Sequence, residues 1–370
     1  MKKFRLLLAG VVLCLTNINS WAQVSADIAL IGRLDLNPTF YFQKGTHPDF
    51  CFGNSVFYTD FEASFGENVK MTWVGHWLET GAAELPFMTQ NPEIYYTTPD
   101  LYKSTWRSDS NTWTDFFYFD FLAGNWTFRL GKDVVAIGGF EYDAWDWDCT
   151  YSMSSLYWQC NAAYQWGASV NWMTPSEMSD FTVQAISSTY TERPWQKGLG
   201  SYAFKYHGEY GPIETSNAVN FVQSDPDDKA RGVGYLTLGL KGNISDQLSI
   251  GAEWTNRWDS RNAFKQSFFK QSSKSLLTIL YAPTPRLSFD IRGGFERIGI
   301  EQELGNYIEF DDGEDIVPTN YGFGGLTVSY SLLRNSEDLR LLGTIASNNF
   351  IKGVDVSVGI IYNHNFHVGK

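Results

Sequence analysis

The segment from Val134 to Asn161 combines acidic and aromatic side chains at unusual density. No Lys or Arg occurs anywhere between Val134 and Glu192. Carboxylates grouped without basic partners attract cations, and indole rings offer flat apolar faces on which a sugar can stack. The residues concerned are Glu141, Asp143, Asp146 and Asp148 among the acids and Trp145, Trp147 and Trp158 among the tryptophans. The segment therefore has the composition of a site for cations or for polar, sugar-like solutes.

Alternation of polar and apolar residues identifies the elements that position this segment. From Leu287 to Glu296, odd positions are apolar or Gly and even positions are polar or Gly, and a strand points successive side chains to opposite faces. About sixteen such stretches occur, each long enough to cross a bilayer as a tilted strand. We place them near residues 27–42, 55–65, 69–80, 113–122, 125–133, 163–173, 180–190, 201–210, 216–223, 232–242, 246–256, 274–283, 286–297, 321–331, 337–346 and 353–362.

The connections between these stretches alternate in length. Residues 66–68 and 123–124 are short turns, whereas 81–112, 134–162 and 298–320 are long. Short periplasmic turns and long external loops are typical of outer-membrane barrels. No amphipathic helix covers the apolar face, so lipid must cover it. The sequence predicts an all-β, transmembrane antiparallel barrel of about sixteen strands, with the last strand paired to the first.

The first residues predict a secretion signal. Lys2, Lys3 and Arg5 precede an apolar stretch from Leu6 to Leu15, and small residues stand at the two positions before a cleavage point after Ala22. A retained membrane anchor is the alternative, but the apolar stretch is too short to span a bilayer as a helix. We expect residues 1–22 to be the signal peptide and 23–370 a single barrel domain in the bacterial outer membrane.

Cysteine content and net charge restrict the chemistry further. Secretion places the three remaining cysteines in an oxidising compartment. Cys149 and Cys160 lie in one long loop, so we predict a disulfide between them, with three free thiols as the alternative. The formal net charge of −13 argues against nucleic acid as a partner, because phosphate contacts need Lys and Arg. We expect no catalytic residue, metal or cofactor, and we interpret the acidic runs at 225–228 and 311–315 as solvated loops rather than calcium sites.

The stretch from Trp126 to Asp133, WTFRLGKD, resembles the strand with an Arg-x-Gly-Lys ending that leads into the third loop of the phosphate-selective-porin-like (porin O/P-like) group of Gram-negative bacteria. The resemblance implies a porin for small polar solutes, with the bilayer and lipopolysaccharide as surroundings and a possible homotrimer. In that family the third loop folds inward and narrows the pore. For this chain, the resemblance implies that the loop over 134–162 folds inward and places the acids and tryptophans named above at the constriction. The alternative is that this loop packs on neighbouring external loops.

The pore wall expected from strand parity is partly basic. A basic wall opposite an acidic loop would create a transverse electric field. Its members are Arg33, Arg129, Arg292 and Arg340, with Lys132 added from the third-loop motif. Phosphate selection needs a concentration of Arg and Lys donors, and the loop is acidic instead. We therefore expect a modest preference for cations and neutral solutes.

Three other functions remain open on the sequence. The tryptophans could make the pore sugar-preferring, or the third loop could close it and leave a non-conducting structural or adhesive barrel. A barrel enzyme is the third possibility. His76 and His207 have lumen parity, but nothing in the sequence marks a serine partner for either.

Overall fold

The computed structural model describes most of the predicted barrel. It covers residues 26–36, 39–43, 49–51, 55–80, 87–88, 95–96, 114–141, 153–155, 163–189, 191, 194–259, 272–298, 319–333, 338–349 and 353–368. The described residues include twenty strands and a short 3-10 turn, η4 (Gln196–Gly198). None of the helices in this part of the chain is long and apolar enough to cross a membrane.

All sixteen predicted strands are present, fourteen of them within three residues of both expected bounds; those expected at 27–42 and 353–362 end elsewhere, at Leu36 and Val368. They are β1 (Ala26–Leu36), β4 (Ser55–Phe65), β5 (Val69–Thr80), β8 (Phe116–Ala123), β9 (Trp126–Val134), β10 (Tyr164–Met173), β11 (Ser179–Ser187), β12 (Gly200–Tyr210), β13 (Ile213–Gln223), β14 (Gly232–Ser245), β15 (Leu248–Asp259), β16 (Ser272–Thr284), β17 (Leu287–Ile298), β18 (Thr319–Ser331), β19 (Leu339–Asn348) and β20 (Gly353–Val368). Four short strands accompany them: β2 (Thr39–Gln43), β3 (Asp49–Cys51), β6 (Phe87–Met88) and β7 (Tyr95–Tyr96).

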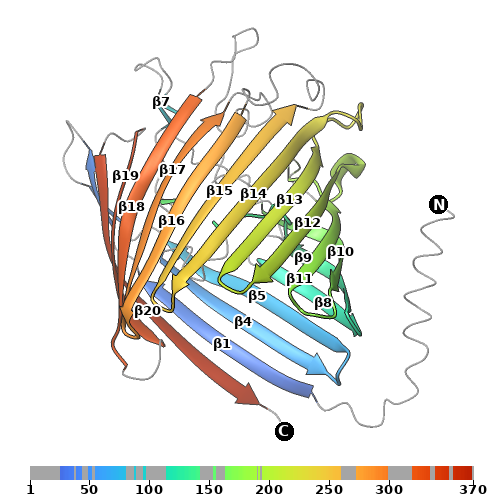
Figure 1. The fold of residues 1–370 in the computed structure, drawn as a ribbon, viewed down its shortest axis with the longest axis horizontal. Helices are drawn as coiled ribbons and strands as arrows, with labels where there is room; N and C mark the ends of the chain where they lie inside the picture. The colour runs from blue at the N-terminus through green and yellow to red at the C-terminus, as the bar shows by residue number, and fades with distance from the viewer. Residues whose placement is uncertain are drawn as a thin grey trace, which may run out of the picture.

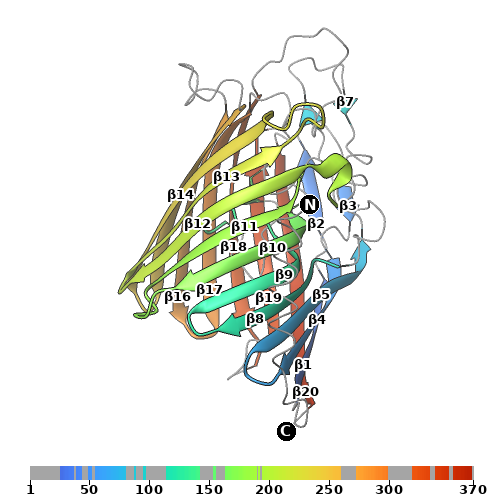
Figure 2. The ribbon, with the colours of Figure 1, turned by 90° about the vertical axis from the view of Figure 1, so that its right-hand side faces the viewer.

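Antiparallel pairing closes the sheet on itself. The main sheet contains eighteen strands, and each of the sixteen long ones pairs with its neighbour in the chain. The first strand, β1, pairs with β4 on one side and with β20 on the other. Strands β2 and β3 prolong the sheet at the seam, where β2 pairs with β20 and β3. The result is a barrel of tilted strands (Figures 1 and 2), which confirms the predicted fold class.

Short turns gather at one end of the barrel, together with the start of β1 and the end of β20 (Figure 1). Gly66, Gly124 and Gly211 lie at three of these turns with φ between 59° and 65°. Glycine adopts this left-handed conformation without a Cβ penalty, so it allows a strand to reverse within a few residues. We call this end of the barrel the short-turn end.

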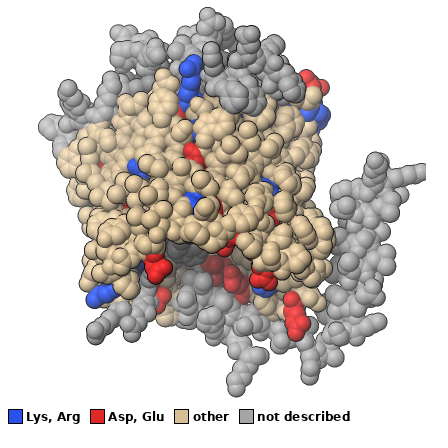
Figure 3. Space-filling view, viewed as in Figure 1, with Lys and Arg blue, Asp and Glu red and all other residues tan. Residues whose placement is uncertain are grey.

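The two faces of the wall differ as the alternation predicts. Val183, Leu240 and Val358 are 56–58% exposed on the outer face, whereas Gln184 and Thr237, on the inner face of the same wall, are buried. Charged side chains are sparse over the middle of the wall turned toward the viewer in Figure 3. Exposing such an apolar surface to water costs about 25 cal/mol per Å², and a hydrocarbon environment removes that cost.

Candidate functional site

The segment after β9, residues 135–141, lies along the inner wall of the barrel. The side chain of Gln184 accepts a hydrogen bond from the Ala136 amide and donates one to the Val134 carbonyl, both at 2.8 Å. Asn220 donates to the Ala136 carbonyl, also at 2.8 Å. Both side chains belong to the polar inner face of β11 and β13, so they fix the start of the third loop inside the barrel.

Two glycines allow the backbone to approach the wall closely. Gly138 and Gly139 have φ of 80° and 78°. A Cβ on Gly138 would lie 3.0 Å from the Ala218 nitrogen, and one on Gly139 would lie 2.5 Å from Oε2 of Glu253. The Gly139 amide donates to the Ser216 carbonyl at 3.0 Å. Glycine is required here both by its conformation and by the lack of space.

A buried ion-pair cluster holds the end of this segment. Lys274 Nζ lies 2.6 Å from Glu141 Oε2 and also forms an ion pair with Glu253 Oε1. The amides of Phe140 and Glu141 donate to Glu253 Oε2 at 2.7 and 3.0 Å. The Ser155 hydroxyl and amide donate to the Glu141 carboxylate, the former at 2.9 Å. We call Glu141, Glu253 and Lys274 the Lys274 anchor.

The Lys274 anchor has more negative than positive charge, and its hydrogen bonds offset the difference. Complete burial raises the pKa of Glu141, while the Lys274 ammonium acts in the opposite direction. A buried charge costs several kcal/mol unless it is paired and hydrogen-bonded, and charge-assisted bonds from backbone amides are among the strong ones. Because protein donors enclose both carboxylates, the anchor fixes the third loop and leaves little room for a solute.

One cavity of about 380 Å³ lies against β5 and β8–β12, with residues 134–139 forming part of its lining. Arg129 forms a two-point ion pair with Asp120, at 2.7 and 2.9 Å, and a third contact with Asp133 at 3.0 Å. Lys70 and Lys205 also line this cavity. Its charged side chains are therefore nearly balanced between the two signs.

A second cavity of about 440 Å³ lies against the opposite wall, β14–β19, and Phe140 of the third loop contributes to it. Arg292 is buried and lies 2.8 Å from Asp290. Lys241 and Asp246 add one charge of each sign. The lumen thus contains two cavities with charged side chains in their lining, and the start of the third loop contributes to both.

The remaining residues of the expected pore wall have different surroundings. Arg340 is buried on the inner parity of β19. Arg33 pairs along the backbone with Asn363, and its side chain lies outside the described residues. Lys132 is buried, and its ammonium donates to the carbonyl oxygen of Thr114, next to the start of β8.

Most of the expected constriction lies beyond the part of the chain that the structure describes. Of that set, Glu141 is described, and its carboxylate belongs to the Lys274 anchor. The others lie outside the described residues, as do both cysteines of the predicted disulfide: Asp143, Trp145, Asp146, Trp147, Asp148, Cys149, Trp158 and Cys160.

The acidic loop at 225–228 forms a self-contained turn. Asp225 accepts hydrogen bonds from the amides of Asp227 and Asp228, at 2.9 and 3.3 Å, and lies 3.1 Å from Arg231. These contacts, led by the Asp227 amide, lower the pKa of Asp225. Residues within the turn therefore supply hydrogen bonds and an ion pair to the Asp225 carboxylate.

Comparison with known proteins identifies the fold. Neither a protein-family model nor a curated protein matches the sequence. Among solved structures, the outer-membrane channel DcaP of Acinetobacter baumannii is 13% identical, with a TM-score of 0.54 over 92% of this chain and 98% of that one. OmpT of Vibrio cholerae is 9% identical, with a TM-score of 0.53 over 92% and 99% of the two chains.

A triple mutant of the Rhodopseudomonas blastica porin is 11% identical, with a TM-score of 0.53 over 92% of this chain and 100% of the porin. Identities this low establish the fold alone. The chain has the fold of bacterial outer-membrane porins, an antiparallel transmembrane β-barrel.

Proposed function

We propose that this chain is a porin of a Gram-negative outer membrane, through which small polar solutes diffuse passively. The observation that carries the proposal is the closed ring of sixteen strands with an apolar outer face and a polar inner face. Two cavities with charged side chains in their lining, of about 380 and 440 Å³, lie along opposite inner walls. A soluble protein would have to cover the outer face, whereas a bilayer covers it directly.

We further propose a modest preference for cations and neutral solutes over anions. The chain carries a formal charge of −13, and Asp180, Glu209, Glu214 and Asp246 lie near the short-turn end of the barrel. Asp143, Asp146 and Asp148 of the third loop add to this balance, whereas Glu141 is paired with Lys274. Because the cavities themselves contain nearly equal numbers of positive and negative side chains, we expect a modest preference rather than a strict one.

The finer features of the proposal come from the sequence. They are a cleaved signal at 1–22, a third loop folded inward over 134–162 with a Cys149–Cys160 disulfide, and contacts with lipopolysaccharide in a possible homotrimer. The contacts of residues 135–141 with the inner wall support the inward loop. The motif from Arg129 to Lys132 supports kinship with the phosphate-selective-porin-like group, without its anion preference.

The test is electrical. The mature chain, folded in detergent, is inserted into a planar bilayer under a KCl gradient, and single-channel conductance and reversal potential are recorded. Stepwise openings with a reversal potential on the cation side support the proposal. Anion selectivity would overturn the cation preference, and silence from inserted, folded protein would overturn the porin function. The same protein unfolded by heat serves as the control for detergent artefacts.

A further inference from the structure

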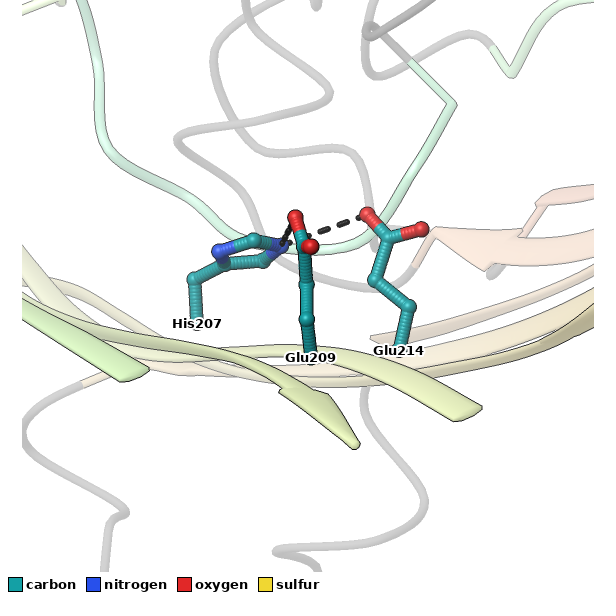
Figure 4. Close-up of side chains that lie close together, drawn as sticks. All are labelled: His207, Glu209 and Glu214. Atoms are coloured by element: carbon teal, nitrogen blue, oxygen red, sulfur yellow. Dashed lines mark hydrogen bonds and ion pairs between the residues drawn. The ribbon is translucent and has the colours of Figure 1, made fainter. Parts of the chain in front are cut away.

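One histidine and two carboxylates converge on the inner face near the short-turn end. His207 and Glu209 belong to β12 and Glu214 to β13, on either side of the turn at Gly211 (Figure 4). His207 Nε2 lies 3.2 Å from an oxygen of Glu214 and 3.9 Å from one of Glu209. One ligand atom from each residue lies within 4.8 Å of the other two.

A fourth residue orients the histidine. Asp180 Oδ2 lies 3.0 Å from His207 Nδ1, and Asn171 donates to the other oxygen of Asp180 at 2.7 Å. The carboxylate thus accepts the Nδ1 proton and directs Nε2 toward the two glutamates. A carboxylate in this position fixes the tautomer and ring orientation of metal-binding histidines.

The position between His207 Nε2 and the two glutamates suits a positive charge. With its proton on Nδ1, a neutral His207 presents a lone pair on Nε2, which would face two carboxylates. Either a second proton or a metal ion must separate them. Lys241 neutralises part of the charge, because its ammonium lies 2.8 Å from Glu214 Oε2. That contact uses Oε2, and the other oxygen, Glu214 Oε1, faces His207 Nε2 at 3.2 Å.

We propose that His207, Glu209 and Glu214 bind Zn²⁺. Ligand atoms about 2.0–2.1 Å from a tetrahedral zinc ion lie about 3.4 Å apart. The Nε2–Glu214 separation of 3.2 Å already matches this value. The Glu209 oxygen must come about half an ångström closer to His207 Nε2, and its side chain, which is 68% exposed, has the freedom to do so.

The types of ligand atom indicate which metal ion the site prefers and how many ligands that ion has. An imidazole nitrogen with two carboxylates suits zinc and its neighbours in the first transition row, whereas calcium prefers six or more oxygens. Three protein ligands leave the fourth tetrahedral position to water. Glu209 is exposed close to the turn at Gly211, so an ion can reach it from solution without unfolding of the wall.

Calorimetry tests this proposal without requiring an open pore. The mature chain is folded in detergent, treated with EDTA, freed of chelator and titrated with ZnCl₂. We expect saturable binding of one ion per chain. Asp180→Asn should weaken it 10- to 100-fold, as expected for the loss of a carboxylate that orients a ligand. His207→Gln and Glu209→Gln should each weaken it at least tenfold.

Glu67→Gln is the matched control, because Glu67 is an exposed acid in the 66–68 turn, and it should leave zinc affinity unchanged. Glu209→Gln changes an exposed side chain, so it keeps the test informative if His207→Gln fails to fold; far-UV circular dichroism checks each variant. Absence of saturable zinc binding overturns the proposal. Equal binding by the control and by Glu209→Gln also overturns it, as does calcium binding of equal affinity.

Discussion

Two clusters inside the barrel have similar composition and opposite exposure. The Lys274 anchor places one ammonium between Glu141 and Glu253, and all three side chains are at most 3% exposed. The cluster at the short-turn end places one imidazole between Glu209 and Glu214, and its side chains are 18–68% exposed.

The difference shows how burial decides what a charge cluster does. In the anchor, every carboxylate must find a protein donor, because desolvation without a partner costs several kcal/mol. The donors that satisfy Glu253 and Glu141 are backbone amides of the third loop and Ser155. At the short-turn end, water screens the charges, so an incomplete set of partners is tolerated and a ligand can enter. The Lys274 anchor therefore stabilises the position of the third loop, whereas the cluster at the short-turn end is accessible to a ligand.

The largest effect is expected from Lys274→Met. This change leaves Glu141 and Glu253 buried without their common cation, and breaking a buried pair costs about 3–5 kcal/mol. We expect this loss of unfolding free energy in urea titrations followed by far-UV circular dichroism. Lys229→Met is the control, since Lys229 is exposed and its ammonium donates to the Lys197 carbonyl rather than to a buried carboxylate. Equal stability of the two variants would contradict the role assigned to the anchor.

An intermediate effect is expected where the third loop approaches the wall. Gly139→Ala adds a Cβ at a φ of 78° and 2.5 Å from Glu253 Oε2. Gly66→Ala adds one at a φ of 65° with no atom within 4 Å. Both should lose about 1–3 kcal/mol from the strained conformation, and Gly139→Ala should lose more because of the clash. The same urea titrations measure both; if Gly66→Ala loses as much as Gly139→Ala, the loop does not press against Glu253.

The smallest effect is expected from Glu209→Gln. An exposed carboxylate that contacts only its own cluster should change the unfolding free energy by no more than about 0.5 kcal/mol in the absence of metal. Zinc should raise the melting temperature of the unmodified chain, because a ligand that binds the folded state stabilises it. The same zinc concentration should leave the variant nearly unchanged. A large loss of stability without metal would place Glu209 among structural residues.

Particular strands show what could be predicted from the sequence. The stretches at 55–65 and 69–80 were predicted with the bounds that β4 and β5 have, because lipid on one side and water on the other impose a period of two. The stretch at 27–42 proved to be two strands, β1 ending at Leu36 and β2 beginning at Thr39. Pro38 lies between them, and proline has no amide proton for a strand ladder. The last strand continues to Val368, beyond its predicted end.

Neither the Lys274 anchor nor the cluster of His207, Glu209 and Glu214 could be predicted from the alternation of polar and apolar residues. Parity places Glu253 and Lys274 on an inner face, yet it gives no reason to join them to Glu141, which is 133 residues from Lys274 in the chain. His207 was recognised as a lumen residue, whereas its partners Asp180 and Glu214 come from neighbouring strands and depend on strand register.

Which residues face lipid and which face the lumen follows from the sequence, because side-chain direction in a strand is a local property with a period of two. Which inner residues contact one another depends on the tertiary structure. Closing the ring and laying residues 135–141 across the inner wall bring together side chains from strands far apart in the chain. These contacts depend on the path of the third loop, which the alternation of polar and apolar residues does not predict.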